Sequence, residues 1–162
     1  YREEPVPDAD ATTRDAYLRW MRASAPAFLA PFVLIALSQV LAAGGRAATA
    51  APAGLRSALI ALAVGAVLFG RSYVRRIPLA PSGASADAAL ALVRSTSWSL
   101  LGFAVAPSIL GLVLVLFTRS LGDALLMLAL TLGGFALLYP RVTQWHSWLG
   151  HLTAPVQEGP AS

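Results

Sequence analysis

The chain has 162 residues, of which 57% are hydrophobic and only 12% are charged, and its mean hydropathy is +0.66. Soluble domains carry roughly 25% charged residues, and disordered chains combine low hydrophobicity with high net charge, so this composition excludes both classes and indicates a membrane protein. The formal net charge is +4, and the lack of cysteine excludes disulfides, thiolate nucleophiles and cysteine-ligated metals.

Residues 1–24 form a polar head that precedes the first apolar run. Thr12 and Asp15 have the spacing of a capping box, and Trp20 lies in an arginine-containing stretch that follows them. This pattern predicts a helix at the membrane surface. The head also contains five acidic residues and lacks a short basic lead, which argues against the first apolar run being a secretory signal peptide.

Four apolar runs approach the length of a membrane span, which needs about 20 residues. The second has only 14 residues between two arginines, so its helix must continue through Tyr73 and Val74 while both arginines extend toward the membrane surface. Four helices that are apolar all round would leave a soluble bundle without polar faces, which argues against that alternative. The predicted spans are Ala25–Ala43, Ser57–Gly70, Trp98–Phe117 and Ala124–Tyr139, within a transmembrane domain over residues 25–140.

The connections around the third span carry their own signals. A loop around Pro78 and Pro81 is followed by the alanine-rich stretch Ala86–Val93, which we expect to extend the third helix into the cytoplasm. Asp87 falls in the first turn of that extension, where the helix dipole favours a carboxylate. The third and fourth spans are joined by a tight hairpin over Thr118–Asp123.

Residues 141–162 form the tail of the chain. Trp145, Trp148, Leu149 and Leu152 follow the spacing i, i+3, i+4 and i+7, which places them on one face of a helix. We expect this helix to lie flat on the membrane with its tryptophans at the level of the lipid headgroups. These tryptophans are either an ordinary aromatic belt, which the pattern favours, or a docking surface for a partner subunit.

The arginines set the orientation of the spans. All 12 basic residues are arginines, and counting them on alternate sides of the four spans places nine on one side and three on the other. By the positive-inside rule, both termini and the middle loop lie in the cytoplasm, and the fold is two helical hairpins. The bias toward alanine, leucine and arginine suggests a GC-rich bacterial genome and hence a bacterial inner membrane. Because the arginines form no patch interleaved with aromatics, no nucleic-acid partner is expected.

The predicted spans contain no ionisable side chain in their middle, where pumps and ion-coupled transporters place such groups. The polar residues at depth are Gln39, Ser108 and Thr131, together with Ser38, and such residues most often bond a neighbouring helix or their own backbone. His146 and His151 lie beyond the last span and five residues apart, on different faces of a helix, so neither a cofactor nor a metal is expected. No catalytic set of residues converges, and no soluble substrate is indicated, so we expect a protein that is not an enzyme.

Small residues recur along the spans, often four apart, as they do where helices in membranes approach closely. Such faces favour tight packing, either inside the bundle or against another subunit. Alanine is so common in this chain that some of these spacings arise by chance. The candidate interface positions are Gly65, Gly70, Gly102, Ala106, Gly133 and Gly134, in addition to Trp20, Trp145 and Trp148.

The third span contains the string APSILGLVL, from Ala106 to Leu114. It resembles the carboxylate-bearing helix of the rotor-ring proteolipids of rotary ATPases, and it is similar to strings in uncharacterised small four-span bacterial membrane proteins. The resemblance covers about ten of the 162 residues, and the position of the ion-binding acid is occupied by Val105. It therefore implies a packing helix of that shape without the ion-carrying function.

These observations predict an all-α polytopic membrane protein with four transmembrane helices and short interfacial helices at both ends. Because the spans lack charges at depth and little mass lies outside them, we expect a non-catalytic accessory or assembly subunit of a larger, energy-transducing bacterial inner-membrane complex. Its partners would be the lipid bilayer and other membrane subunits. The alternative is a small oligomeric transporter or channel whose polar path is lined by Gln39, Ser108 and Thr131.

Overall fold

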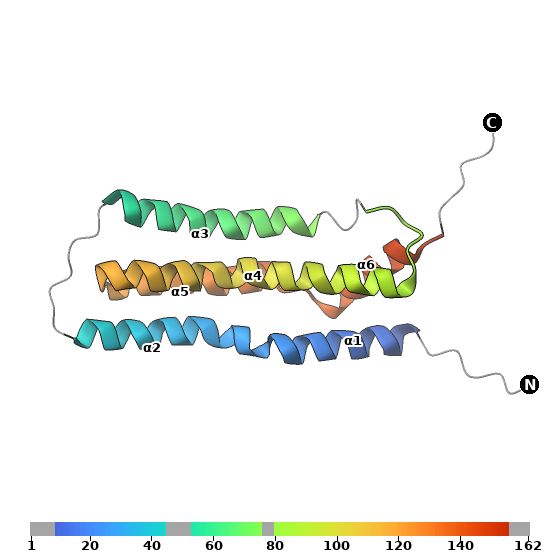
Figure 1. Ribbon diagram of the computed structural model, residues 1–162, viewed down its shortest axis with the longest axis horizontal. Coiled ribbons are helices and arrows are strands. Elements are labelled where there is room, and N and C mark those ends of the chain that lie inside the picture. The colour runs from blue at the N-terminus through green and yellow to red at the C-terminus, as the bar shows by residue number, and fades with distance from the viewer. Residues whose placement is uncertain (1–8, 45–52, 76–79, 156–162) are drawn as a thin grey trace, which may run out of the picture.

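A computed structural model describes residues 9–44, 53–75 and 80–155 of the chain. Within these ranges every regular element is helical, and the helices run along one long axis (Figure 1). They are α1 (Ala9–Ser24), the 3-10 helix η1 (Ala25–Leu29), α2 (Ala30–Ala43), α3 (Ala53–Val74), α4 (Ala86–Thr118), α5 (Leu121–Leu138) and α6 (Val142–Thr153).

Four stretches of helix are long and apolar enough to cross a membrane, and they coincide with the four predicted spans. They are Ala11–Leu41, Gly54–Val74, Ala86–Thr118 and Leu121–Leu138. Large apolar side chains point outward from all of them, among them Phe32, Leu68, Ile109 and Leu137. In water these side chains would be costly, whereas a bilayer is a favourable solvent for them. The prediction of an all-α polytopic membrane protein is confirmed.

The α4 and α5 helices form the centre of the bundle. They contact each other extensively, while α2 and α3 each pack on this pair from opposite sides (Figure 1). The spans follow one another in the two predicted hairpins, but α4 and α5 lie between α2 and α3. The reason is that α4 and α5 carry packing faces in several directions: 44% and 39% of their most apolar windows are buried, against 22% for the first span and 11% for α3.

Two features hold α4 close to α5. The helices are joined through Arg119 and Ser120, and Arg119 has a left-handed backbone (φ 48°), while the Ser120 hydroxyl accepts a hydrogen bond from the Asp123 amide. This agrees with the predicted tight hairpin. Further along the pair, Gly111 and Gly134 have no β-carbon, which lets the two helices approach closely. A β-carbon at Gly134 would lie 3.2 Å from the Ala104 carbonyl oxygen.

The first span is interrupted rather than straight. The η1 helix separates α1 from α2, and prolines stand at the start of both η1 and α2. Proline lacks the N–H that would continue an α-helical ladder, which explains the break. Thr12 lies inside α1, so the expected capping box at Thr12 and Asp15 is wrong as the start of this helix.

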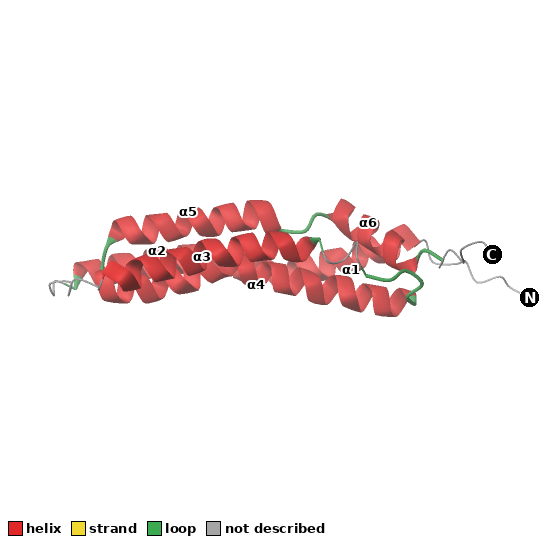
Figure 2. Ribbon diagram, turned by 90° about the horizontal axis from the view of Figure 1, so that it is seen from above, coloured by secondary structure: helices red, strands yellow, loops and turns green. Residues whose placement is uncertain are grey.

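The chain builds a second, smaller group of helices at one end of the bundle. At 1.5 Å per residue, the 33 residues of α4 span about 50 Å, whereas the 18 residues of α5 span about 27 Å. A hydrocarbon core is about 30 Å thick, so the first turns of α4 extend beyond it. This agrees with the predicted extension, which begins at Ala86 with Asp87 in its first turn. Figure 2 shows α1 and α6 beside this extension.

An ion pair closes the opposite end of the bundle. The Arg56 guanidinium on α3 lies 2.7 Å from an Asp123 carboxylate oxygen on α5, and its Nε donates a hydrogen bond of 2.9 Å to the same oxygen. The Asp123 side chain is 3% exposed, whereas that of Arg56 is 56% exposed. The pair therefore joins α3 to α5 and neutralises a carboxylate that has been taken out of water.

The tight contact between α4 and α5 predicts a large effect of one added methyl group. In Gly111→Ala the new β-carbon would lie 2.6 Å from Cβ of Met127, which is not the flexible end of a side chain, so the helices must separate. We expect a loss of about 1–3 kcal/mol in the free energy of unfolding, measured by thermal unfolding in detergent. The control is Gly102→Ala on the same helix, where nothing lies within 4 Å and stability should hold or rise. Equal melting temperatures for the two variants would contradict the packing.

The ion pair predicts a coupled effect of two substitutions. Arg56→Gln leaves the buried Asp123 carboxylate without its partner, and we expect a cost of about 1–3 kcal/mol, reduced from that of a fully buried pair because Arg56 is largely exposed. Adding Asp123→Asn removes the uncompensated charge, so the double variant should be more stable than Arg56→Gln alone. A double-mutant cycle measures this coupling, and strictly additive costs would contradict it.

Candidate functional site

Three tryptophans form the interior of the α1, α4 and α6 end. Trp20, Trp145 and Trp148, hereafter the tryptophan cluster, are 1%, 0% and 6% exposed. The ring centroids of Trp20 and Trp145 are 5.8 Å apart. Two tyrosines also contact these rings: Tyr17 meets Trp145 edge-on with a centroid distance of 5.6 Å, and the Tyr139 ring centroid lies 5.3 Å from that of Trp20. Such tilted and edge-on geometries are favourable for aromatic rings.

The expectation that these tryptophans face lipid or a partner is therefore wrong for the tryptophan cluster. The helix and its apolar face are as predicted, but the face turns inward. The physical reason is that the extension of α4 offers an apolar surface at Ala89 and Val93, on which Leu152 and the indole rings pack. Protein atoms exclude water from this face, so it does not need the bilayer.

Hydrogen bonds between distant segments tie this end together. The Ala84 amide donates to the Leu152 carbonyl at 2.9 Å, and the Tyr17 hydroxyl donates to the Pro140 carbonyl at 3.3 Å. A ring nitrogen of His151 lies 3.2 Å from the Ala80 carbonyl oxygen. His151 thus bonds the loop before α4. Over residues 9–44, 53–75 and 80–155, no three histidine, aspartate or glutamate side chains gather into a metal site. The described parts of the predicted head and tail, α1 and α6, thus form one structural unit with the start of α4.

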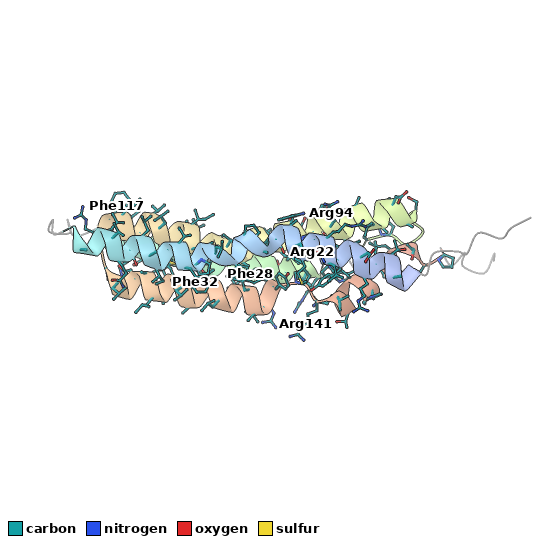
Figure 3. The ribbon with its side chains drawn as sticks, turned by 90° about the horizontal axis from the view of Figure 1, so that it is seen from below. Arg22, Phe28, Phe32, Arg94, Phe117 and Arg141 are labelled. Carbon is teal, nitrogen blue, oxygen red and sulfur yellow. The ribbon has the colours of Figure 1, made fainter. Side chains whose placement is uncertain are left out.

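A cavity of about 480 Å³ opens between α1, α4 and α6. Its charged lining is Arg19 from α1 with Asp87 and Arg94 from α4, and its aromatic lining is Trp98 and Trp145. Figure 3 shows Arg94 and Arg22 toward the same end of the molecule, with Phe117 near the other. The remaining lining residues are Ala16, Leu90, Ala91 and Ser95.

The charged groups of this cavity do not neutralise one another. Among the described residues, neither Arg19 nor Arg94 forms an ion pair with Asp87. The indole nitrogen of Trp145 is buried and has no hydrogen-bond partner within that part of the chain. The sequence does contain a signal for this site. Arg94 and Trp98 follow Asp87 by seven and eleven residues, so the three residues share one face of a helix. The contribution of α1 has no such signal.

The polar residues predicted at membrane depth separate into two groups. Ser108 and Thr131 are buried between α4 and α5, and their hydroxyl oxygens lie 2.9 Å apart. Since the Thr131 hydroxyl donates to the Met127 carbonyl, Ser108 is the donor to Thr131. Ser38 is also buried and donates to its own helix at Ile35. The expectation that such residues bond their neighbours is confirmed for these three.

Gln39 differs from the other polar residues at depth. It lies on the exposed face of α2 and has no hydrogen-bond partner in the part of the chain that the structure describes. It does not share a path with Ser108 and Thr131, which face the interior of the same bundle. Within a single chain these three residues therefore do not line one path, and a path formed by several copies of the chain stays a prediction.

The small residues also fall into two groups. Gly70 and Gly134 are buried at helix contacts, where a β-carbon at Gly70 would lie 2.7 Å from the Leu138 side chain. These two serve the internal packing, and Ala106 is half-buried. In contrast, Gly65, Gly102 and Gly133 are exposed, and no atom lies within 4 Å of the position where a β-carbon would stand.

The fold defines an all-α polytopic membrane protein, with a four-helix core and a helical unit at one end. Comparison of the chain with protein-family models, curated proteins and solved structures finds no match. The string from Ala106 to Leu114, which resembles a proteolipid helix, lies in the C-terminal half of α4. Val105, at the position of the ion-binding acid, is half-buried against the apolar contacts of that helix.

The tryptophan cluster predicts strong dependence on one indole ring. Trp145→Ala removes a fully buried side chain that contacts α1 and α4, and we expect a cost of about 3–5 kcal/mol, seen as a lower melting temperature in detergent. Trp98→Ala on the rim, where the side chain is 41% exposed, is the control and should cost less. A larger loss for Trp98→Ala would contradict the interior position of Trp145.

Proposed function

We propose that this protein is a non-catalytic accessory or assembly subunit of a larger membrane complex, acting through helix packing. An energy-transducing complex of a bacterial inner membrane is the host that we favour. The observation that carries the proposal is the set of outward glycines Gly65, Gly102 and Gly133, which no contact among the described residues requires.

A glycine inside a helix costs roughly 0.5–1 kcal/mol relative to alanine, so its presence needs a reason. At Gly111 and Gly134 the reason is the close approach of α4 and α5. At the outward glycines the part of the chain that the structure describes supplies no neighbour for a β-carbon. In membranes, small residues on a helix surface let a second helix approach closely, which supports a partner helix at these positions. Ala61, four residues before Gly65, is exposed on α3 as well.

The arrangement of polar groups supports a packing role rather than a transport role. The buried hydroxyls of Ser108 and Thr131 satisfy each other, which leaves them unavailable to a passing solute. The ionisable pair of Arg56 and Asp123 lies at the end of α3 and α5, not in the middle of the bundle. Transporters need polar or charged ligands near mid-membrane.

The distribution of arginines supports an orientation with α1 and α6 in the cytoplasm. Of the arginines in the described residues, those near the α1 and α6 end outnumber those near the opposite end, where Arg56 and Arg119 lie. The positive-inside rule associates the arginine-rich side with the cytoplasm. The arginines at the α1 and α6 end are Arg14, Arg19, Arg22, Arg71, Arg75, Arg94 and Arg141.

A second candidate function rests on Gln39. Its amide points away from the bundle, so several copies of the chain could bring their Gln39 side chains together around a common path. This oligomeric channel would use Gln39 without Ser108 or Thr131. The accessory role is favoured because it accounts for three outward glycines, whereas the channel accounts for one outward amide.

The accessory role predicts that a bulky side chain at Gly65 prevents assembly without unfolding the chain. After mild detergent extraction, the amount of other subunits that co-purify with Gly65→Leu should be about tenfold lower than with the wild-type chain, because a leucine blocks close helix approach. Its melting temperature as an isolated chain should stay near that of the wild type, because the space beyond Gly65 is open. The matched control is Ala36→Leu, because Ala36 is also small and exposed but lies on a different helix, α2.

Two results would count against this role. One is a wild-type chain that extracts gently as a homogeneous species of one chain type. The other is unchanged co-purification when leucine replaces each of Gly65, Gly102 and Gly133. Solute exchange by the purified chain in liposomes, lost in Gln39→Leu, would instead favour the channel.

A further inference from the structure

We propose that the cavity between α1, α4 and α6 binds the headgroup of a zwitterionic phospholipid. In this site Arg19 and Arg94 hold the phosphodiester, and Asp87 holds the ammonium group. The three side chains come from two helices and line one cavity of about 480 Å³. That volume lies in the range of about 300–1,000 Å³ in which proteins hold small ligands.

The two arginines supply the phosphate-binding part of the site. The guanidinium group donates paired hydrogen bonds that match the oxygens of a phosphate. Arg19 and Arg94 have no ion-pair partner among the described residues, although Asp87 lines the same cavity. Among the described residues, no carboxylate occupies their donors. Two arginines from different helices also favour one shared anion over two separate ones.

The position of the cavity along α4 favours a lipid over a soluble phosphate. Trp98 opens the apolar run of α4 and is 41% exposed, as expected for an aromatic side chain at the edge of the hydrocarbon. Arg94 lies four residues, or about 6 Å, further from the membrane centre. Trp20 contacts Trp98 with a centroid distance of 6.2 Å, which places its neighbour Arg19 at a similar depth. A lipid whose acyl chains lie beside Trp98 brings its phosphate to these arginines.

Asp87 favours a zwitterionic headgroup over an anionic one. It lies seven residues before Arg94, so it is about 10 Å further out along the same face of α4. The ammonium of an ethanolamine headgroup also lies outside the phosphate. A purely anionic headgroup would bring further negative charge toward Asp87, which has no cationic partner among the described residues. The order of tryptophan, arginine and aspartate thus matches the order of acyl chain, phosphate and ammonium.

Lipid binding to the full chain in detergent, measured by native mass spectrometry, tests this site. The probes are phosphatidylethanolamine and phosphatidylglycerol, and we expect the wild type to prefer phosphatidylethanolamine. Arg94→Gln and Arg19→Gln should each weaken that binding about fivefold, as expected for a charged contact at an open site. Asp87→Asn should retain the phosphate contact and lose the preference between the two lipids.

The matched control is Arg71→Gln, which removes an exposed arginine from the end of α3 without touching the cavity. All these positions are exposed, so the variants should keep the wild-type melting temperature. Equal losses in Arg94→Gln and Arg71→Gln would overturn the site, because they would reflect net charge alone. Tighter binding of phosphatidylglycerol by the wild type would overturn the role of Asp87. Glycerophosphoethanolamine, which lacks acyl chains, should compete poorly; competition as strong as that of the lipid would assign the site to a soluble phosphate.

Discussion

Close packing of α4 against α5 is the contact on which the rest of the structure depends. It requires glycine where the two backbones meet, at Gly111 and Gly134, and a two-residue connection at Arg119 and Ser120. Once the pair has formed, its two remaining sides accept α2 and α3. Apolar attraction alone cannot organise helices in a bilayer, since lipid tails are as apolar as leucine. Shape therefore decides which helices lie together, and the two hydroxyls of Ser108 and Thr131 add a directional bond.

The unequal lengths of α4 and α5 produce the second part of the molecule. Because α4 continues past the end of α5, it presents a surface that α5 does not cover. The amphipathic α6 and the polar α1 supply that cover, and the tryptophan cluster is the result. The same three helices leave a charged cavity beside Trp98. A helix that continues past its packing partner thus creates both a second, smaller core and a cavity beside it.

The distribution of residues that the chain does not satisfy internally indicates where it meets other molecules. Most buried polar groups have partners, as low dielectric demands. At the surface of the described helices, three features have no partner among the described residues: the outward glycines, the outward amide of Gln39 and the charges of the cavity. The first supports a neighbouring helix, and the last supports a lipid headgroup. Each is a surface property, and these are the places where we propose that lipid or another protein contacts the chain.

Composition and periodicity alone determined the membrane environment, the four spans, the extension of α4 and the apolar face of α6, because these properties depend on residues close together in the chain. Only the tertiary structure decided what each face touches. The face with Trp145 could meet lipid, a partner or α4, and the outcome depended on the position of a distant helix. Likewise, Gly65 and Gly134 have similar local sequence signals, yet one faces outward and the other inward. The cavity escaped prediction for the same reason, since Arg19 and Arg94 line one cavity only because the fold brings α1, α4 and α6 together.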